Sequence, residues 1–146
     1  MHKALNYLSL ARKAGRIELG EEPVGAAARA GKARLIVGAG DASDHTWRRA
    51  KSFAAGTDQQ CVRVAFGKDE MGLVVGRSSL AIAAFTDPAM AVAFVKALDG
   101  QERYRDALAA LEQKSEKLRR RESEAKAHER NVKLGKRRHS PEPKKD

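Results

Sequence analysis

Residues 11–37 read ARKAGRIELGEEPVGAAARAGKARLIV, and this stretch contains the change from helix to strand on which the fold depends. A helix is expected over residues 2–14, because Leu5, Leu8 and Ala11 recur at the spacing of one buried helical face. Gly15 follows in the C′ position that favours glycine. Residues 16–19 alternate in polarity and are therefore predicted to form a very short strand.

A second helix is predicted to begin at Gly20 within the same stretch. Glu21 and Glu22 fall in its first turn, where negative charge meets the positive end of the helix dipole. Pro23 is tolerated there, because the first N–H groups of a helix lack intrahelical partners. Gly31 is expected to end this helix. The apolar run at residues 35–37 is typical of a strand buried on both faces.

The same alternation continues to residue 98 and predicts an α/β fold with a small sheet covered by helices. Ser43 is a favourable N-cap for the next helix, and Gly72 is expected to break the helix that contains it. The downstream elements are predicted at residues 44–55 (helix), 60–66 (strand), 69–75 (short helix), 80–85 (strand) and from 87–88 onward (helix).

Charge and composition divide the chain into a domain at residues 1–100 and a tail at residues 101–146. The domain carries 14 basic and 10 acidic residues, whereas the shorter tail carries 15 basic and 9 acidic residues. Apolar residues nearly vanish after Leu118, so the tail cannot bury enough surface to offset its ordering entropy. It is predicted to be a basic arm that is partly helical or disordered. A plain solvated extension is the alternative.

Composition also excludes several functional classes. Cys61 is the only cysteine, which rules out an internal disulfide and argues against a zinc cluster. Its apolar neighbours favour a buried, structural thiol. The four histidines have no partners at metal-binding spacing. No secretory signal or apolar run of membrane-spanning length is apparent, so a cytoplasmic protein without a membrane partner is expected.

No catalytic constellation can be identified in the sequence. The glycines at positions 38 and 40 follow a strand, but the third glycine of a dinucleotide fingerprint is replaced by Ser43. Glu21 and Glu22 are adjacent, so they point to different sides of a helix and form a poor acid/base pair. The two serines at positions 78 and 79 have no nearby histidine to activate them. We therefore expect no enzymatic activity, no cofactor and no metal.

The net charge of +10 instead favours a polyanionic partner. Gly20 allows close approach of a backbone, and free N–H groups at a helix start can bond to phosphate or base acceptors. Glu21 and Glu22 could accept hydrogen bonds from exposed bases, with guanine as the natural target. The alternative is that these glutamates only complement the helix dipole.

Five segments of the sequence resemble the bacterial L-seven-Ae-type ribosomal protein family. The matching residues lie at positions 8–15, 20–22, 29–37, 41–43 and 76–82, with Thr86 and Asp87 after the last segment. The resemblance covers residues 2–98 and implies a three-layer α/β/α sandwich with a small mixed sheet. It also implies binding to structured RNA, typically kink-turn elements of ribosomal or other RNA.

The chain departs from the family pattern at the start of the second helix. Kink-turn readers of this family have a Gly-x-Asn-Glu-x-x-Lys pattern there. Gly20 matches the glycine, whereas Glu22, Pro23 and Ala26 stand at the asparagine, glutamate and lysine positions. A hydrogen-bond acceptor is kept at position 22, but the amide donor and the lysine are absent.

These observations predict a non-catalytic RNA-binding protein that is ribosomal or ribosome-associated. The helix start would contact bases, the basic residues would neutralise phosphates, the loop at residues 76–79 would close the site, and residues 119–145 would add salt-sensitive affinity. A protein-interaction module in a ribosome-linked assembly is the alternative. The predicted RNA-binding residues are Arg12, Lys13, Arg16, Gly20, Glu21, Glu22, Lys32, Arg77, Ser78 and Ser79.

Overall fold

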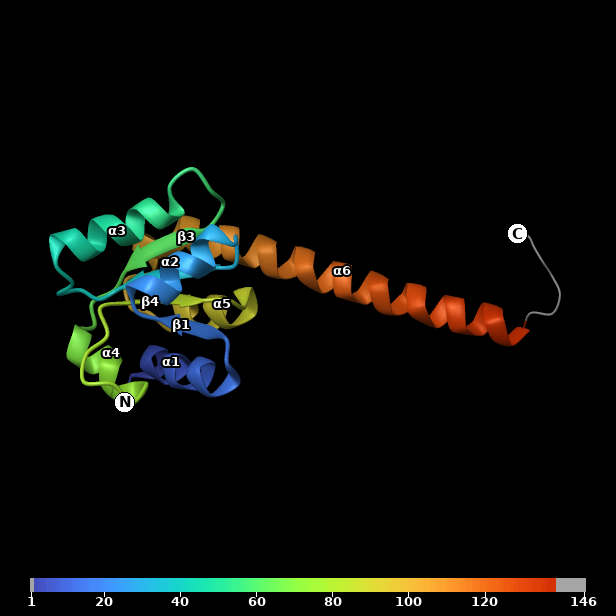
Figure 1. Cartoon of the computed structure of the whole chain (residues 1–146), viewed down its shortest axis with the longest axis horizontal. Coiled ribbons are helices and arrows are strands. Elements are labelled where there is room, and N and C mark those ends of the chain that lie inside the picture. The colour runs from blue at the N-terminus through green and yellow to red at the C-terminus, as the bar shows by residue number, and fades with distance from the viewer. Residues whose placement is uncertain (1, 139–146) are drawn as a thin grey trace. The chain divides into compact units, whose positions relative to one another are not determined.

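The computed structural model describes the backbone of residues 2–138 and the side chains of residues 2–132. Helices and strands alternate along the chain (Figure 1). Their bounds are α1 Lys3–Ala14, β1 Ile17–Leu19, α2 Glu21–Arg29, β2 Leu35–Gly38, α3 Asp44–Ala54, β3 Gln60–Arg63, α4 Lys68–Val74, β4 Ile82–Phe85, α5 Pro88–Lys96, the 3-10 helix η1 Gln101–Tyr104 and α6 Arg105–Arg138.

The four strands form one mixed sheet in the order β1-β4-β2-β3. β4 is antiparallel to both of its neighbours, and its Phe85 lies opposite Ile17 of β1 and Leu35 of β2. β2 and β3 run parallel, with Gly38 opposite Arg63. Every residue of β2 and β4 is buried, as expected for the central strands of a sheet that is covered on both faces.

Helices cover both faces of the sheet, which confirms the predicted α/β sandwich (Figure 1). Leu8 of α1, Met71 of α4 and Phe94 of α5 pack with the sheet into the larger apolar core. Val24 of α2 and Ala50 of α3 belong to a smaller core on the opposite face. The small side chains of this second core allow α2 and α3 to approach the sheet closely.

The predicted helix ends are confirmed where glycine or a capping side chain determines them. Gly15 ends α1 in the left-handed conformation, with φ of 68°. Ser43 caps α3 by accepting a hydrogen bond from the backbone N–H of Thr46 at 3.2 Å. β3 ends at Arg63 and is shorter than the predicted strand at residues 60–66, and beyond it Gly40 still donates to the carbonyl of Phe66 at 2.8 Å.

The prediction that Gly72 breaks its helix is wrong. α4 continues through this residue to Val74. A Cβ atom at position 72 would lie 2.8 Å from the backbone nitrogen of Ser79 and 2.9 Å from the carbonyl oxygen of Arg77. Gly72 is therefore the point at which α4 contacts the following loop, and the absence of a side chain permits that contact.

The first compact unit extends past the predicted boundary at residue 100 and ends at Gln113. Tyr104, Ala107 and Leu111 are buried in the larger core, so η1 and the start of α6 belong to this unit. The second unit begins at Lys114 and continues α6 to Arg138. From Arg119 to Val132 its described side chains are exposed. The part of the predicted arm beyond residue 138 lies outside the described residues.

Candidate nucleic-acid interface

The strand register defines two ends of the sheet at which loops and helix termini gather. The Ile82 end contains Leu19 of β1, Ile82 of β4, Gly38 of β2 and Arg63 of β3. The Phe85 end contains the opposite termini of the same strands. α2 begins directly after Leu19, so its N-terminus lies at the Ile82 end. The loop that precedes β4 reaches the same end, because Ile82 is the first residue of that strand.

Gly20 is the residue that joins β1 to α2 at the Ile82 end. Its φ of 96° is a conformation that favours glycine, and its N–H donates to the carbonyl of Ile82 at 3.0 Å. A methyl group at this position would lie 3.8 Å from Nη1 of Arg77. The guanidinium of Arg77 therefore lies beside the first turn of α2, which Gly20 leaves without a side-chain cap.

The two glutamates of this first turn have different surroundings. Glu21 is held against α3, because its carboxylate pairs with Nε of Arg49 at 3.1 Å and accepts from the hydroxyl of Thr46 at 3.5 Å. Glu22 is exposed, and within the described part of the chain it has no hydrogen bond or ion pair. Glu22, rather than Glu21, is therefore the acceptor that is available to a ligand.

The loop at residues 76–79 presents exposed side chains beside the same helix start. Gly76 has a φ of 78°, and the backbone N–H of Arg77 donates to the carbonyl of Gly72 at 2.9 Å. Ser78 and Ser79 are exposed. Leu73, at the end of α4, is 78% exposed and adds an apolar surface next to this loop. The structure thus brings Arg77 beside Gly20, and Ser78 and Ser79 follow Arg77 in the same exposed loop.

Four other predicted residues do not lie beside this helix start. Arg12, Lys13 and Arg16 lie where α1 leads into β1, and the carbonyl of Arg16 accepts from the N–H of Thr86 beyond β4. Lys32 follows α2 and is close in sequence to Arg34, whose N–H donates to the carbonyl of Phe85. All four are exposed at the Phe85 end.

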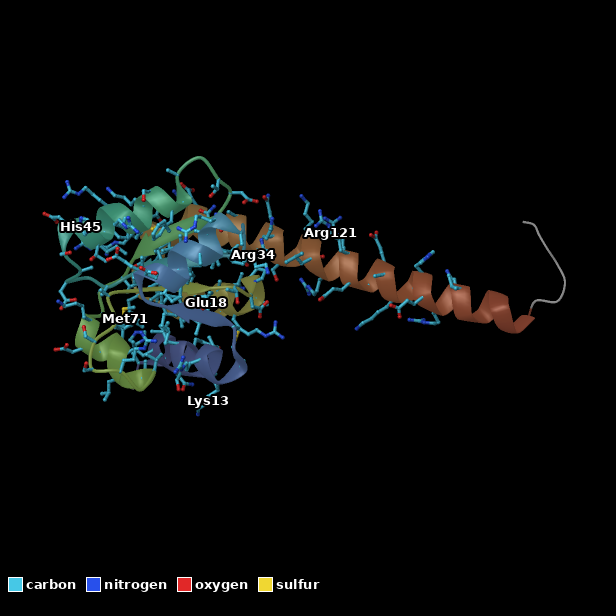
Figure 2. The ribbon with its side chains drawn as sticks, in the orientation of Figure 1. Lys13, Glu18, Arg34, His45, Met71 and Arg121 are labelled. Atoms are coloured by element: carbon cyan, nitrogen blue, oxygen red, sulfur yellow. The ribbon has the colours of Figure 1, made fainter. Side chains whose placement is uncertain are left out.

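The separation of the two ends can be followed in Figure 2. Lys13 and Arg34 lie on one side of the first unit, whereas His45 near the start of α3 lies on the other. Residues 11–20 are continuous in the sequence, but Ile17 and Leu19 lie at opposite ends of the sheet. The strand β1 lies between the two groups, and it carries the chain from one end of the sheet to the other.

Three cationic residues near the Ile82 end were not predicted from the sequence. Arg49 pairs with Glu21, Lys68 begins α4, and Arg63 ends β3. Arg63 places its guanidinium 5.4 Å from the centroid of the Trp47 ring. Their positions depend on how β3, α3 and α4 pack in the fold, which the local sequence does not specify.

Three further properties of the described residues concern metal, thiol and membrane chemistry. They contain no group of three or more His, Cys, Asp or Glu side chains placed to hold a metal ion. Burial raises the pKa of the half-buried Cys61 to about 12, and the nearby Lys51 lowers this pKa only in part. A thiol with so high a pKa is a poor nucleophile. None of the described helices is both long and apolar enough to cross a bilayer.

No family model matches this sequence, and no curated protein matches it. The fold is similar to that of a protein of unknown function from Bacillus halodurans C, with a TM-score of 0.63, 22% identity, and coverage of 68% of this chain and 99% of that chain. A second solved structure, a Giardia lamblia 15.5kD RNA binding protein, gives a TM-score of 0.49 and 19% identity over 67% of this chain and 83% of that one. At 22% identity, the first of these similarities establishes the fold alone.

Proposed function

We propose that this chain is a non-catalytic RNA-binding protein that reads structured RNA with the Ile82 end of its sheet. The observation that carries the proposal is the position of Arg77 beside Gly20, at a helix start with an unpaired carboxylate on Glu22. A cation, free backbone N–H groups and an acceptor are thereby combined on one exposed surface. Cations and backbone N–H groups bind phosphates, and a carboxylate can accept hydrogen bonds from base edges.

Each of these groups has a distinct role in the proposed site. Arg77 neutralises a phosphate, and its planar guanidinium can also form a bidentate contact with a base. Glu22 accepts hydrogen bonds from the imino and amino groups of a guanine. Gly20 allows the RNA to approach the first turn of α2, because no side chain covers this turn. The arrangement fits a bent or unpaired RNA element better than the deep, narrow major groove of an A-form duplex.

The resemblance of residues 76–82 to L-seven-Ae-type ribosomal proteins, together with Gly20 and the acceptor kept at Glu22, supports a kink-turn or a related motif as the RNA. A ribosomal or ribosome-associated role follows from the same resemblance and is part of this proposal. The cations at the Phe85 end, Arg12, Lys13, Arg16 and Lys32, would contact a separate stretch of backbone. They contribute affinity there without sequence information.

A binding titration over a salt series tests the proposal. The full-length protein is titrated against a kink-turn RNA and against an unrelated hairpin of equal length. We expect the kink-turn RNA to bind at least about tenfold more tightly at about 0.15 M salt, where non-specific binding is weakened.

Two results would contradict the proposal. Equal, weak binding to both RNAs would show that the protein only attracts polyanions. Absence of RNA binding at low salt would favour the alternative, a protein-interaction module, for which the exposed Leu73 would provide an apolar contact.

A further inference from the structure

The free edge of β3 borders a groove that the proposed RNA site does not use. β3 is an edge strand of the sheet, and it pairs only with β2 among the described strands. The groove has a volume of about 740 Å³ and extends along residues 61–65 between α3 and η1. Trp47, Arg63, Arg103 and Tyr104 line it together with the backbone of these residues.

The backbone of this edge offers hydrogen-bonding groups to a ligand. Gln60 and Val64 donate their N–H groups to carbonyls of Arg34 and Gly38, on the β2 side. Because successive residues of a strand point their backbone groups to opposite sides, those of Cys61 and Arg63 face away from β2. The carbonyl of Arg63 accepts from the hydroxyl of Tyr104 at 3.3 Å, so this group is already partnered.

The groove also has positive charge that no described carboxylate neutralises. Arg63 donates to the carbonyl of Ala42 at 3.0 Å, but its Nε is buried without a hydrogen-bond partner. Arg103 is exposed and has no ion pair with any carboxylate in the described part of the chain. Asp41 lies at one end of the groove, where its Oδ1 accepts from the backbone N–H of Lys68 at 2.8 Å. Its charge is therefore directed to the start of α4.

The aromatic side chains of the groove are already in contact with other groups of the protein. The Trp47 ring has the guanidinium of Arg63 at 5.4 Å and the ammonium of Lys51 at 5.9 Å from its centroid. The Trp47 ring also packs against Gly38, because a Cβ atom built at Gly38 would lie only 2.7 Å from Cε3 of the ring. Tyr104 is 3% exposed, and its hydroxyl is bonded. The groove thus lacks the stacking platforms that single-stranded nucleic acid needs.

We propose that this groove binds an extended acidic peptide, which adds a strand to the free edge of β3. The added strand would pair with the outward backbone groups of residues 61–65, a length of roughly 16 Å at about 3.3 Å per residue. Acidic side chains of the peptide would pair with Arg63 and Arg103. The unpaired edge and the two cations give the main-chain affinity and the charge preference of such a site.

Anisotropy and NMR measurements with a defined peptide test this proposal on the full-length protein. The probe is a labelled Glu-Val-Glu-Val-Glu peptide with blocked ends, and a Lys-Val-Lys-Val-Lys peptide is its charge control. Arg103→Glu is expected to weaken binding of the acidic peptide about fivefold or more. Arg105→Glu makes the same charge change at a residue that pairs with Glu102 outside the groove, and it should change the affinity less than about twofold.

The pattern of amide protection identifies the mode of binding. With the acidic peptide bound, the amide of Cys61 should exchange more slowly, whereas that of Val64, which already donates to Gly38, should change little. Two peptides are N-methylated, one at its Glu nitrogens and one at its Val nitrogens, and one of the two should lose binding, because only one alternate set of nitrogens pairs with the edge.

Three outcomes would overturn the proposal. Equal effects of Arg103→Glu and Arg105→Glu would show that only the net charge attracts the peptide. Unimpaired binding of both N-methylated peptides would exclude strand addition. A short oligouridylate that shifts the same amides, with a dependence on Arg103, would assign the groove to nucleic acid. Arg77→Ala is expected to leave peptide binding unchanged, so failure here is distinguishable from failure of the proposed RNA site.

Discussion

Glu21 and Glu22 are adjacent in the sequence, and their surroundings give them different roles. Glu21 joins α2 to α3 through Arg49 and Thr46, whereas Glu22 is exposed and unpaired among the described residues. The sequence predicts that both lie in a first helical turn, and that prediction is confirmed. It could not distinguish them, because the partners of Glu21 are far from it along the chain and depend on how α3 packs.

Substitution of each glutamate should separate the two roles. Glu22→Ala is expected to weaken binding to the preferred RNA about tenfold, because a lost base contact costs about 1–3 kcal/mol. Glu21→Ala, the matched control, should lower the free energy of unfolding by less than about 1 kcal/mol, since the pair with Arg49 is partly exposed. Filter binding and urea unfolding provide the two measurements. A Glu22→Ala variant that binds equally well or better would remove the glutamate from the recognition site.

The Cys61 thiol should react slowly with disulfide reagents in the native protein. Its pKa of about 12 leaves very little thiolate at pH 8, compared with the ordinary value of 9.0. We expect the native protein to react at least about tenfold more slowly than the urea-unfolded chain, as followed by absorbance of the released thiol. Reaction at similar rates in both states would mean that the thiol is not desolvated.

The same pKa shift has a predictable effect on stability. The pKa of Cys61 is higher in the folded protein than in the unfolded chain. Its contribution to the free energy of unfolding is therefore fully present below pH 9 and is lost as the pH rises toward about 12. Between pH 8 and pH 10.5, the melting temperature of the wild type should therefore fall relative to that of Cys61→Ala, as measured by thermal unfolding. A difference that stays constant over this range would contradict the shift.

At the scale of elements, most of the fold could be predicted because local signals agree with one another. Glycines and capping residues define the ends of α1 and α3, and short apolar runs define β2 and β4. The error at Gly72 has a physical reason. Helix propensity treats an internal glycine as unfavourable, but here the missing Cβ allows α4 to touch the backbone of residues 77–79.

Gly72→Ala should therefore destabilise the protein even though alanine is the better helix former. Its Cβ would lie within 2.9 Å of backbone atoms of Arg77 and Ser79, and the required shift should cost about 1–3 kcal/mol. Gly25→Ala in α2 is the control, since its nearest neighbours are ends of the Phe53 and Arg29 side chains. Thermal unfolding measures both variants. An equal or higher melting temperature for the Gly72→Ala variant would show that the loop yields without cost.

At the scale of the whole molecule, the sequence could name candidate residues for the site but not their arrangement in space. Gly20 and Arg77 do meet at the Ile82 end, although they are far apart along the chain. Arg12, Lys13, Arg16 and Lys32 are close to Gly20 in sequence but lie at the Phe85 end. Only the order and direction of the strands decide which end of the sheet each loop occupies, and local sequence does not encode them.

The basic second unit should contribute to RNA affinity mainly through charge. Arg119, Arg120 and Arg121 are exposed, and Arg119 pairs with Glu116. Their simultaneous replacement by serine should reduce the slope of log affinity against log salt by about 2, because each released counterion contributes about 0.7–0.9. Discrimination between the kink-turn RNA and the hairpin should stay unchanged. An unaltered slope would show that these arginines do not contact RNA.

The central claim is that RNA is read at the Ile82 end, and a comparison of charge variants at the two ends tests it most directly. Affinity for the kink-turn RNA is measured at about 0.15 M salt for the full-length wild type, for Arg77→Ala, and for the double variant Arg12→Ala with Lys13→Ala. We predict that Arg77→Ala weakens binding about tenfold and reduces discrimination against the hairpin. The double variant should weaken binding to both RNAs alike. The reverse order of effects, with discrimination lost only in the double variant, would contradict the claim and place the site at the Phe85 end.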